Sequence, residues 1–153
     1  MHTIVVLLLI LVGCTNPGIR PEWNLPPEKS YTGNFQNSGQ EAEGRTVLLR
    51  NLTGFFWPES LLDADFVRLR EEPEQIQAEA IKNGAVIRSE VYKLTNGSLI
   101  ITRNKATGGA LYETVDRFIR IRTGLVVERR EAGISASIPF IGQGSYWFFY
   151  PLK

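Results

Sequence analysis

From Ile76 to Lys93 the chain reads IQAEAIKNGAVIRSEVYK, and this stretch decides the fold class. Apolar and polar residues alternate over 76–80, which is the pattern of a β-strand that is buried on one face. Asn83 and Gly84 follow, and this pair is a strong hairpin signal because both residues tolerate a positive φ. A return strand is expected over 86–93. The stretch therefore predicts an antiparallel β-hairpin.

The same signals recur on both sides of this hairpin. Further strands are expected at 66–70 (FVRLR), at 99–102 after an Asn96-Gly97 turn, at 118–122 and 125–128 around a Thr123-Gly124 turn, and at 145–150 (SYWFFY). Short strands separated by frequent turns predict an all-β domain. Its architecture is expected to be a small antiparallel barrel of about eight strands, with a sandwich as the alternative.

Composition excludes several classes of function. The chain has 153 residues, with 17 Lys and Arg against 16 Asp and Glu, one His and one Cys. The formal charge of +1 argues against nucleic-acid binding, which normally requires a basic excess. A single Cys can form neither an internal disulfide nor a Cys-rich metal site. The only His is His2, which excludes a Ser-His-Asp triad from the rest of the chain. We therefore expect no catalytic residues, no cofactor and no metal.

The N-terminus carries a second strong signal. Residues 4–12 (IVVLLLILV) are uniformly apolar, and Gly13 and Cys14 follow directly. An apolar run of this length is too short to span a bilayer but fits the central region of a secretory signal. The segment 1–3 (MHT) lacks the Lys or Arg that is usual at the start of such a signal.

Leu11-Val12-Gly13-Cys14 resembles the lipobox of bacterial lipoproteins. The resemblance implies that Cys14 receives a diacylglycerol and that the signal peptide 1–13 is cleaved. It also implies a protein held in the bacterial cell envelope by a membrane-inserted lipid. Thr15, which is not Asp, favours the outer membrane, with the domain facing the periplasm.

A Pro-rich stretch separates this anchor from the expected domain. Pro17, Pro21, Pro26 and Pro27 lie within residues 14–30, and proline favours extended, unpaired backbone. We therefore expect 14–30 to be a flexible tether and 31–153 to be a single periplasmic β-domain.

Charged residues supply the first candidate surface. Arg120 and Arg122 share one face of a predicted hairpin, and Arg129 could lie near them or at its open end. Arginine side chains recognise carboxylates and phosphates, so an envelope lipid or another anionic component is a conceivable ligand. Cross-strand ion pairs with interleaved Asp and Glu residues are the alternative explanation. Asp63 and Asp65 are weaker candidates for a cation or acid–base site, because no neighbour in the sequence separates their pKa values.

Aromatic residues supply the second candidate surface. In the strand 145–150, Trp147 and Phe149 face one side and Phe148 faces the other. A strand that is aromatic on both faces is either wholly buried or presents one face to a partner. We expect Phe148 to lie in the core. Trp147 and Phe149 are candidates for a ligand or partner surface, with burial in the core as the alternative.

These observations lead to one main functional prediction and two alternatives. The main prediction is a non-enzymatic, membrane-anchored envelope lipoprotein that binds a protein partner or an envelope component. The first alternative is a carrier of a small apolar ligand, because Tyr31-x-Gly33-x-Phe35 and the late aromatic strand resemble the pattern of lipocalin-like barrels. The weaker alternative is a carboxylate-dependent envelope hydrolase.

Overall fold

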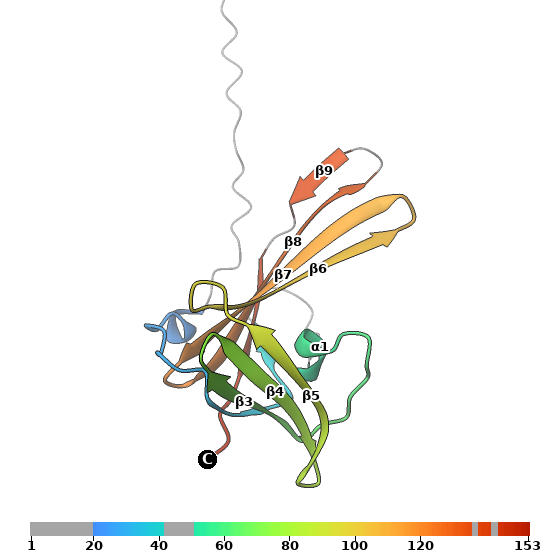
Figure 1. Cartoon of the computed structure of the whole chain (residues 1–153). Helices are drawn as coiled ribbons and strands as arrows, with labels where there is room; N and C mark the ends of the chain where they lie inside the picture. Colours follow the sequence, from blue (N-terminus) through green and yellow to red (C-terminus); the bar gives the residue numbers. More distant parts are fainter. Residues whose placement is uncertain (1–19, 42–50, 136–137, 142–143) are drawn as a thin grey trace, which may run out of the picture.

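The structure, a computed structural model, describes residues 20–41, 51–135, 138–141 and 144–153. The predicted lipidation site Cys14 and the signal peptide 1–13 lie outside these ranges. The elements are, in chain order, η1 (Pro21–Trp23), β1 (Gly33–Gln36), β2 (Gln40–Glu41), α1 (Thr53–Phe56), β3 (Phe66–Glu72), β4 (Gln75–Lys82), β5 (Ala85–Lys93), β6 (Leu99–Thr107), β7 (Ala110–Ile121), β8 (Gly124–Ser135), β9 (Ile138–Ile141) and β10 (Ser145–Phe149) (Figure 1).

The strands form two antiparallel sheets, which confirms the predicted all-β class. The smaller sheet has the order β1-β3-β4-β5, and the larger has the order β2-β10-β8-β7-β6. β8 is long enough to pair with β10 over its first half and with β9 over its last residues.

The main core lies where the two sheets face each other, with α1 between them. Phe55 of α1 is fully buried, and its ring contacts Phe118, Trp147 and Phe149 of the larger sheet at centroid distances of 6.4, 5.1 and 5.9 Å. The smaller sheet contributes apolar residues from alternate positions of β3 and β4, namely Val67, Leu69, Ile76, Ala78 and Ala80. The aromatic residues of α1 therefore fill the space between the sheets.

The other face of the larger sheet is covered by the N-terminal segment. Trp23 is buried, and its ring stacks on Phe148 at 5.4 Å. Pro27 forms a β-bridge with Ile121, and the backbone N–H of Glu28 donates to the carbonyl of Arg120 at 2.7 Å. Residues 23–28, which the sequence placed in a flexible tether, are thus bound to the domain through an indole ring and backbone pairing.

Two of the predicted turns are confirmed in detail. Asn83 and Gly84 have φ values of 50° and 76°, and Asn96 and Gly97 have φ values of 50° and 74°. The third predicted turn is shifted by one residue, because Ile121 pairs with Gly124 and leaves residues 122–123 as the turn. A Cβ at Gly124 would lie 2.4 Å from the Phe148 ring, so this glycine is required for packing.

The described strands do not close into the expected barrel. On one side, a bridge between Phe35 and Pro151 joins the two sheets, supported by a 2.8 Å hydrogen bond from the N–H of Gln36 to the carbonyl of Tyr150. On the other side, the Asn96-Gly97 turn carries the chain from β5 in one sheet to β6 in the other. β5 and β6 are the last strands of their sheets and do not pair with each other, so both are edges. The sandwich alternative describes this arrangement better.

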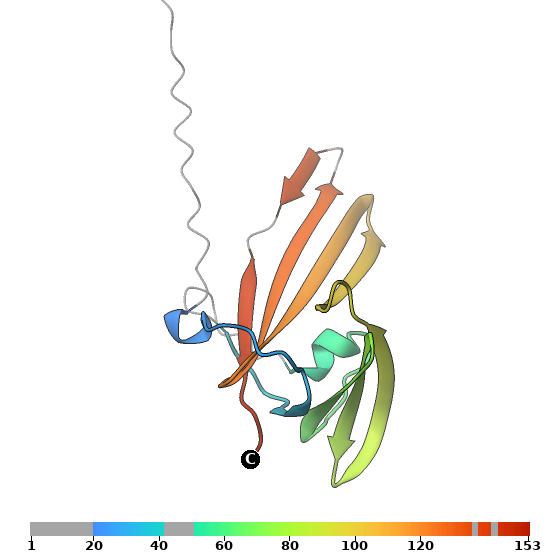
Figure 2. The same ribbon diagram turned by 60° about the vertical axis from the view of Figure 1, so that its left-hand side comes forward.

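The distal part of the larger sheet extends beyond the core. We call residues 104–113, 132–135 and 138–141, which belong to β6, β7, β8 and β9, the arm. Figures 1 and 2 show the arm projecting away from the smaller sheet and from α1.

Candidate functional site

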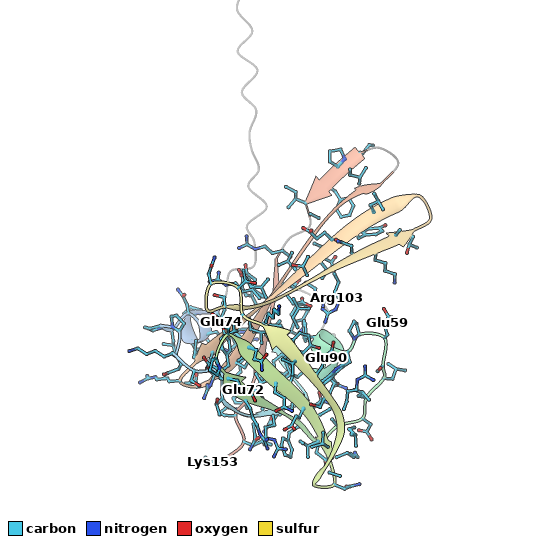
Figure 3. The ribbon with its side chains drawn as sticks, in the orientation of Figure 1. Glu59, Glu72, Glu74, Glu90, Arg103 and Lys153 are labelled. Carbon is cyan, nitrogen blue, oxygen red and sulfur yellow. The ribbon has the colours of Figure 1, made fainter. Side chains whose placement is uncertain are left out.

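Five of the eleven large apolar side chains that are exposed among the described residues lie on the arm. Ile141, Ile138 and Leu111 are 90%, 69% and 62% exposed, and Ile134 and Tyr112 are exposed as well. Figure 3 shows side chains standing on both sides of the arm's ribbon, with Arg103 at its base. The arm is therefore a candidate binding surface.

Register organises the arm into cross-strand rows. Thr107 pairs with Ala110, and Ser135 pairs with Ile138, at its outer end. The second row contains Ala106, Leu111, Ile134 and Pro139; the third contains Lys105, Tyr112, Gly133 and Phe140; the fourth contains Asn104, Glu113, Ala132 and Ile141. Because directly paired residues share a face and successive rows alternate, both faces of the arm carry apolar side chains.

Glycines shape the arm locally. Gly108 and Gly109 have φ values of 56° and 79° and form the turn between β6 and β7. In the third row, the rings of Tyr112 and Phe140 meet edge-on across Gly133, with centroids 5.6 Å apart. A Cβ at Gly133 would lie 2.8 Å from the Phe140 ring and 2.3 Å from the carbonyl oxygen of Leu111. The surrounding side chains border an open hollow of ≈ 660 Å³.

The predicted arginine surface is not assembled. Arg120 donates to the carbonyls of Ile121 and Gly124, the latter at 2.7 Å, and its guanidinium lies over the Phe35 ring at 5.2 Å. Burial lowers the pKa of Arg120. Arg122 is an exposed turn residue. Arg120 therefore holds a hairpin turn against the core.

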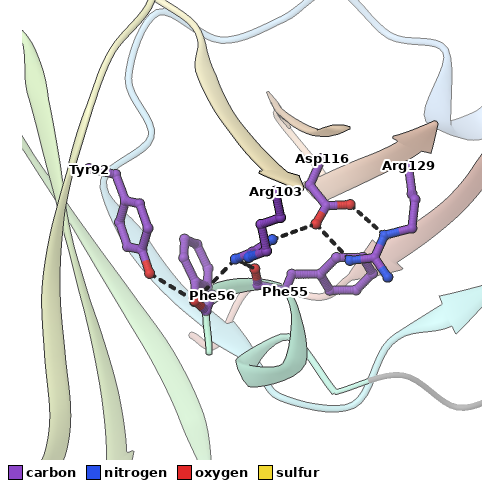
Figure 4. A network of polar contacts seen from close by, with 6 residues as sticks. All are labelled: Phe55, Phe56, Tyr92, Arg103, Asp116 and Arg129. Atoms are coloured by element: carbon purple, nitrogen blue, oxygen red, sulfur yellow. Dashed lines mark hydrogen bonds and ion pairs between the residues drawn. The ribbon is translucent and has the colours of Figure 1, made fainter. Parts of the chain in front are cut away.

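Arg129 belongs to a buried network at the base of the arm. Its Nε and Nη2 donate to Oδ1 and Oδ2 of Asp116, both at 2.6 Å, and Asp116 is fully buried. Arg103 donates to Oδ2 of Asp116 at 3.0 Å and to the carbonyls of Phe55 and Phe56 (Figure 4). The ion-pair alternative is thus the correct one for Arg129.

This network fixes α1 against the larger sheet. The last carbonyls of a helix have no partner within the helix, and an arginine is a suitable donor for them. Arg103 performs this role at Phe55 and Phe56, and the hydroxyl of Tyr92 also donates to the Phe56 carbonyl at 2.9 Å. Burial raises the pKa of Tyr92. The sequence analysis did not single out Arg103. It included Asp116 among the interleaved acidic residues, and the register places this residue opposite Arg129.

Trp147 and Phe149 do not form an exposed patch. They are 5% and 0% exposed and lie in the main core, while Phe148 is buried on the opposite face against Trp23. The partner-surface interpretation of this strand was wrong for a physical reason. The N-terminal segment covers one face and α1 packs against the other, so β10 is buried on both sides.

The two carboxylates near the start of β3 share one lysine as their partner. Lys82 Nζ lies 3.0 Å from Asp63 Oδ2 and 3.3 Å from Asp65 Oδ1. Asp65 also accepts a 2.7 Å hydrogen bond from the N–H of Asn83, and this bond lowers the pKa of Asp65. The pair therefore supports the β4–β5 turn. Within the ranges that the structure describes, no group of three or more His, Cys, Asp or Glu residues is arranged to hold a metal ion.

Comparisons with protein-family models, with curated proteins and with solved structures gave no significant match. Across the described part of the chain, none of the helices has the length and apolarity needed to cross a membrane.

Proposed function

We propose that this protein is a non-enzymatic lipoprotein of the bacterial cell envelope. Cys14 would carry the lipid, the outer membrane would hold it, and the β-domain would face the periplasm. The domain would bind a protein partner or another component of the envelope through the arm.

The exposed apolar side chains of the arm are the observation that supports this proposal. Soluble monomeric proteins rarely expose large contiguous apolar patches unless those patches bind something. The arm lies outside both hydrophobic core clusters, so its apolar residues are not needed to fill the interior. Their exposure is most simply explained by contact with another component.

The carrier alternative has weaker support. A lipocalin-like carrier requires an apolar space inside the domain, and the space between these two sheets is occupied by Phe55, Phe56, Phe118 and Trp147. The hydrolase alternative has weaker support as well, because Asp63 and Asp65 are bound to Lys82 and Asp116 is bound to two arginines.

The anchor is tested by replacing its thiol. Cys14→Ala should abolish lipid attachment, because the only Cys in the chain is the acceptor that the lipobox resemblance implies. Cells would be grown with a labelled fatty-acid analogue, and label on the purified wild-type and variant proteins would be compared. Label on the variant would show that the lipid is attached elsewhere.

The binding surface is tested by photo-crosslinking in intact cells. A photoreactive amino acid at position 141, on the arm, should give discrete crosslinked products with an envelope component. The matched control is position 61, because Leu61 is at least as exposed but lies in the loop before β3, away from the arm. Equal crosslinking at both positions, or none at position 141, would contradict the proposal.

A further inference from the structure

We infer that the outer end of the arm inserts into the surface of the phospholipid bilayer that holds the protein's own lipid anchor. This inference rests on the proposed anchoring through Cys14 and names the component that the arm contacts. Three observations support it.

The first observation is that the arm is apolar on both faces. In the second row, Leu111, Ile134 and Pro139 share one face. In the third row, Tyr112 and Phe140 share the other. A protein partner that docks against one face of a sheet leaves the opposite face in water, whereas a lipid medium surrounds both. A two-sided apolar end is therefore better matched to a bilayer.

The second observation is the position of the charged residues along the arm. The two outermost rows and the Gly108-Gly109 turn contain none in the described ranges, and charge begins with Lys105 in the third row and Glu113 in the fourth. Strand residues rise by about 3.3 Å each, so roughly 7–10 Å of the arm is free of charge. Amphipathic elements at the membrane interface are buried to a depth of about 5–10 Å.

The third row adds to the second observation, because its composition suits the membrane–water boundary. Tyr112 and Phe140 pack together there, beside Lys105. Aromatic rings are enriched at this boundary, and a lysine can extend its ammonium group into water while its aliphatic part stays in an apolar layer. Insertion to the third row would therefore leave each of these groups in a favourable environment.

The third observation is the short distance to the anchor. Only six peptide steps separate Cys14 from Arg20, so their Cα atoms are at most about 20 Å apart. From Arg20 the chain leads into η1, where Trp23 packs on Phe148 of the larger sheet. The register of β10, β8 and β7 places Leu111 and Ile134 on this same face of the sheet. The row of Leu111 and Ile134 lies eight residues, or about 26 Å, along β7 and β8 from the row of Ile119 and Val126 beside Phe148. This span is similar to the reach of the tether, so an anchored domain can place the outer end of its arm at the bilayer.

The experiment uses the full-length lipidated protein in vesicles of phosphatidylethanolamine and phosphatidylglycerol. Because lipidation occupies the only native thiol, a cysteine introduced by Ile138→Cys can be labelled selectively with a polarity-sensitive fluorophore. Ile138 lies in the outermost row and is exposed, so the substitution should not disturb folding, which a melting curve verifies. Leu61→Cys provides the matched control.

At position 138 we expect a blue-shifted emission that is severalfold brighter, quenched by nitroxide-labelled lipids and protected from iodide. At position 61 we expect emission that iodide quenches and nitroxide lipids do not. Equal iodide quenching at both positions would overturn the inference. Protection at position 138 in native outer-membrane fragments but not in pure lipid vesicles would indicate a protein partner, which overturns the bilayer contact and leaves the proposed function intact. Absence of fatty acid from the purified protein would overturn both.

Discussion

At the scale of single residues, charge is used mainly to hold the fold together. Asp116 has no contact with solvent and binds two guanidinium groups. Arg120 and Arg129, both candidates for a ligand surface, contact backbone carbonyls or this carboxylate instead. The alternation of apolar and charged residues along the sequence indicates which residues share one face of a strand. It does not reveal whether another sheet covers that face, so it could not separate a buried ion pair from an exposed binding site.

The Asp116 network leads to a stability prediction. Asp116→Asn should reduce the free energy of unfolding by about 3–5 kcal/mol, because it leaves two largely buried arginines without a carboxylate. Asp63→Asn, at a carboxylate whose side chain is 89% exposed, is the matched control and should change it by less than about 0.5 kcal/mol. Denaturant unfolding measures both values. Equal midpoints for the two variants would show that the network does not stabilise the fold.

At the scale of elements, the turns were the most predictable feature and the environment of the strands was the least. Asn83-Gly84 and Asn96-Gly97 are local signals, since a two-residue turn with positive φ depends on those two residues alone. Which sheet a strand joins depends on contacts between distant residues. The sequence therefore did not reveal that the second turn links two sheets, that Trp23 covers Phe148, or that α1 enters the core.

A substitution in the Asn96-Gly97 turn tests whether this turn forms as predicted. Gly97→Val should cost roughly 1–3 kcal/mol of stability, because a β-branched residue is strained at a φ of 74°. No heavy atom lies within 4 Å of the added Cβ, so a clash of this atom does not contribute to the cost. Gly54→Ala has equally open space and no positive φ, which makes it the control that should not destabilise. A Gly97→Val variant as stable as Gly54→Ala would contradict the observed turn.

At the scale of the whole molecule, the domain combines a filled body with an arm that contributes little to its core. Trp147 and Phe149, the aromatic candidates for a binding surface, are part of the body. The surface that the structure favours instead is built mainly from aliphatic residues of β7, β8 and β9. Residues 138–141 (IPFI) are its local apolar cluster in the sequence, and Leu111 and Ile134 join this cluster only through the β7–β8–β9 register.

The central claim is that the apolar residues of the arm serve binding and not folding. The most direct test is the double variant Ile138→Ser and Ile141→Ser, examined by thermal unfolding and by photo-crosslinking from position 112. Both side chains are more than half exposed, so the melting temperature should stay close to the wild-type value. Crosslinking to the envelope should fall sharply, because the apolar contact is lost. A large drop in melting temperature, or crosslinking as strong as in the wild type, would contradict the claim.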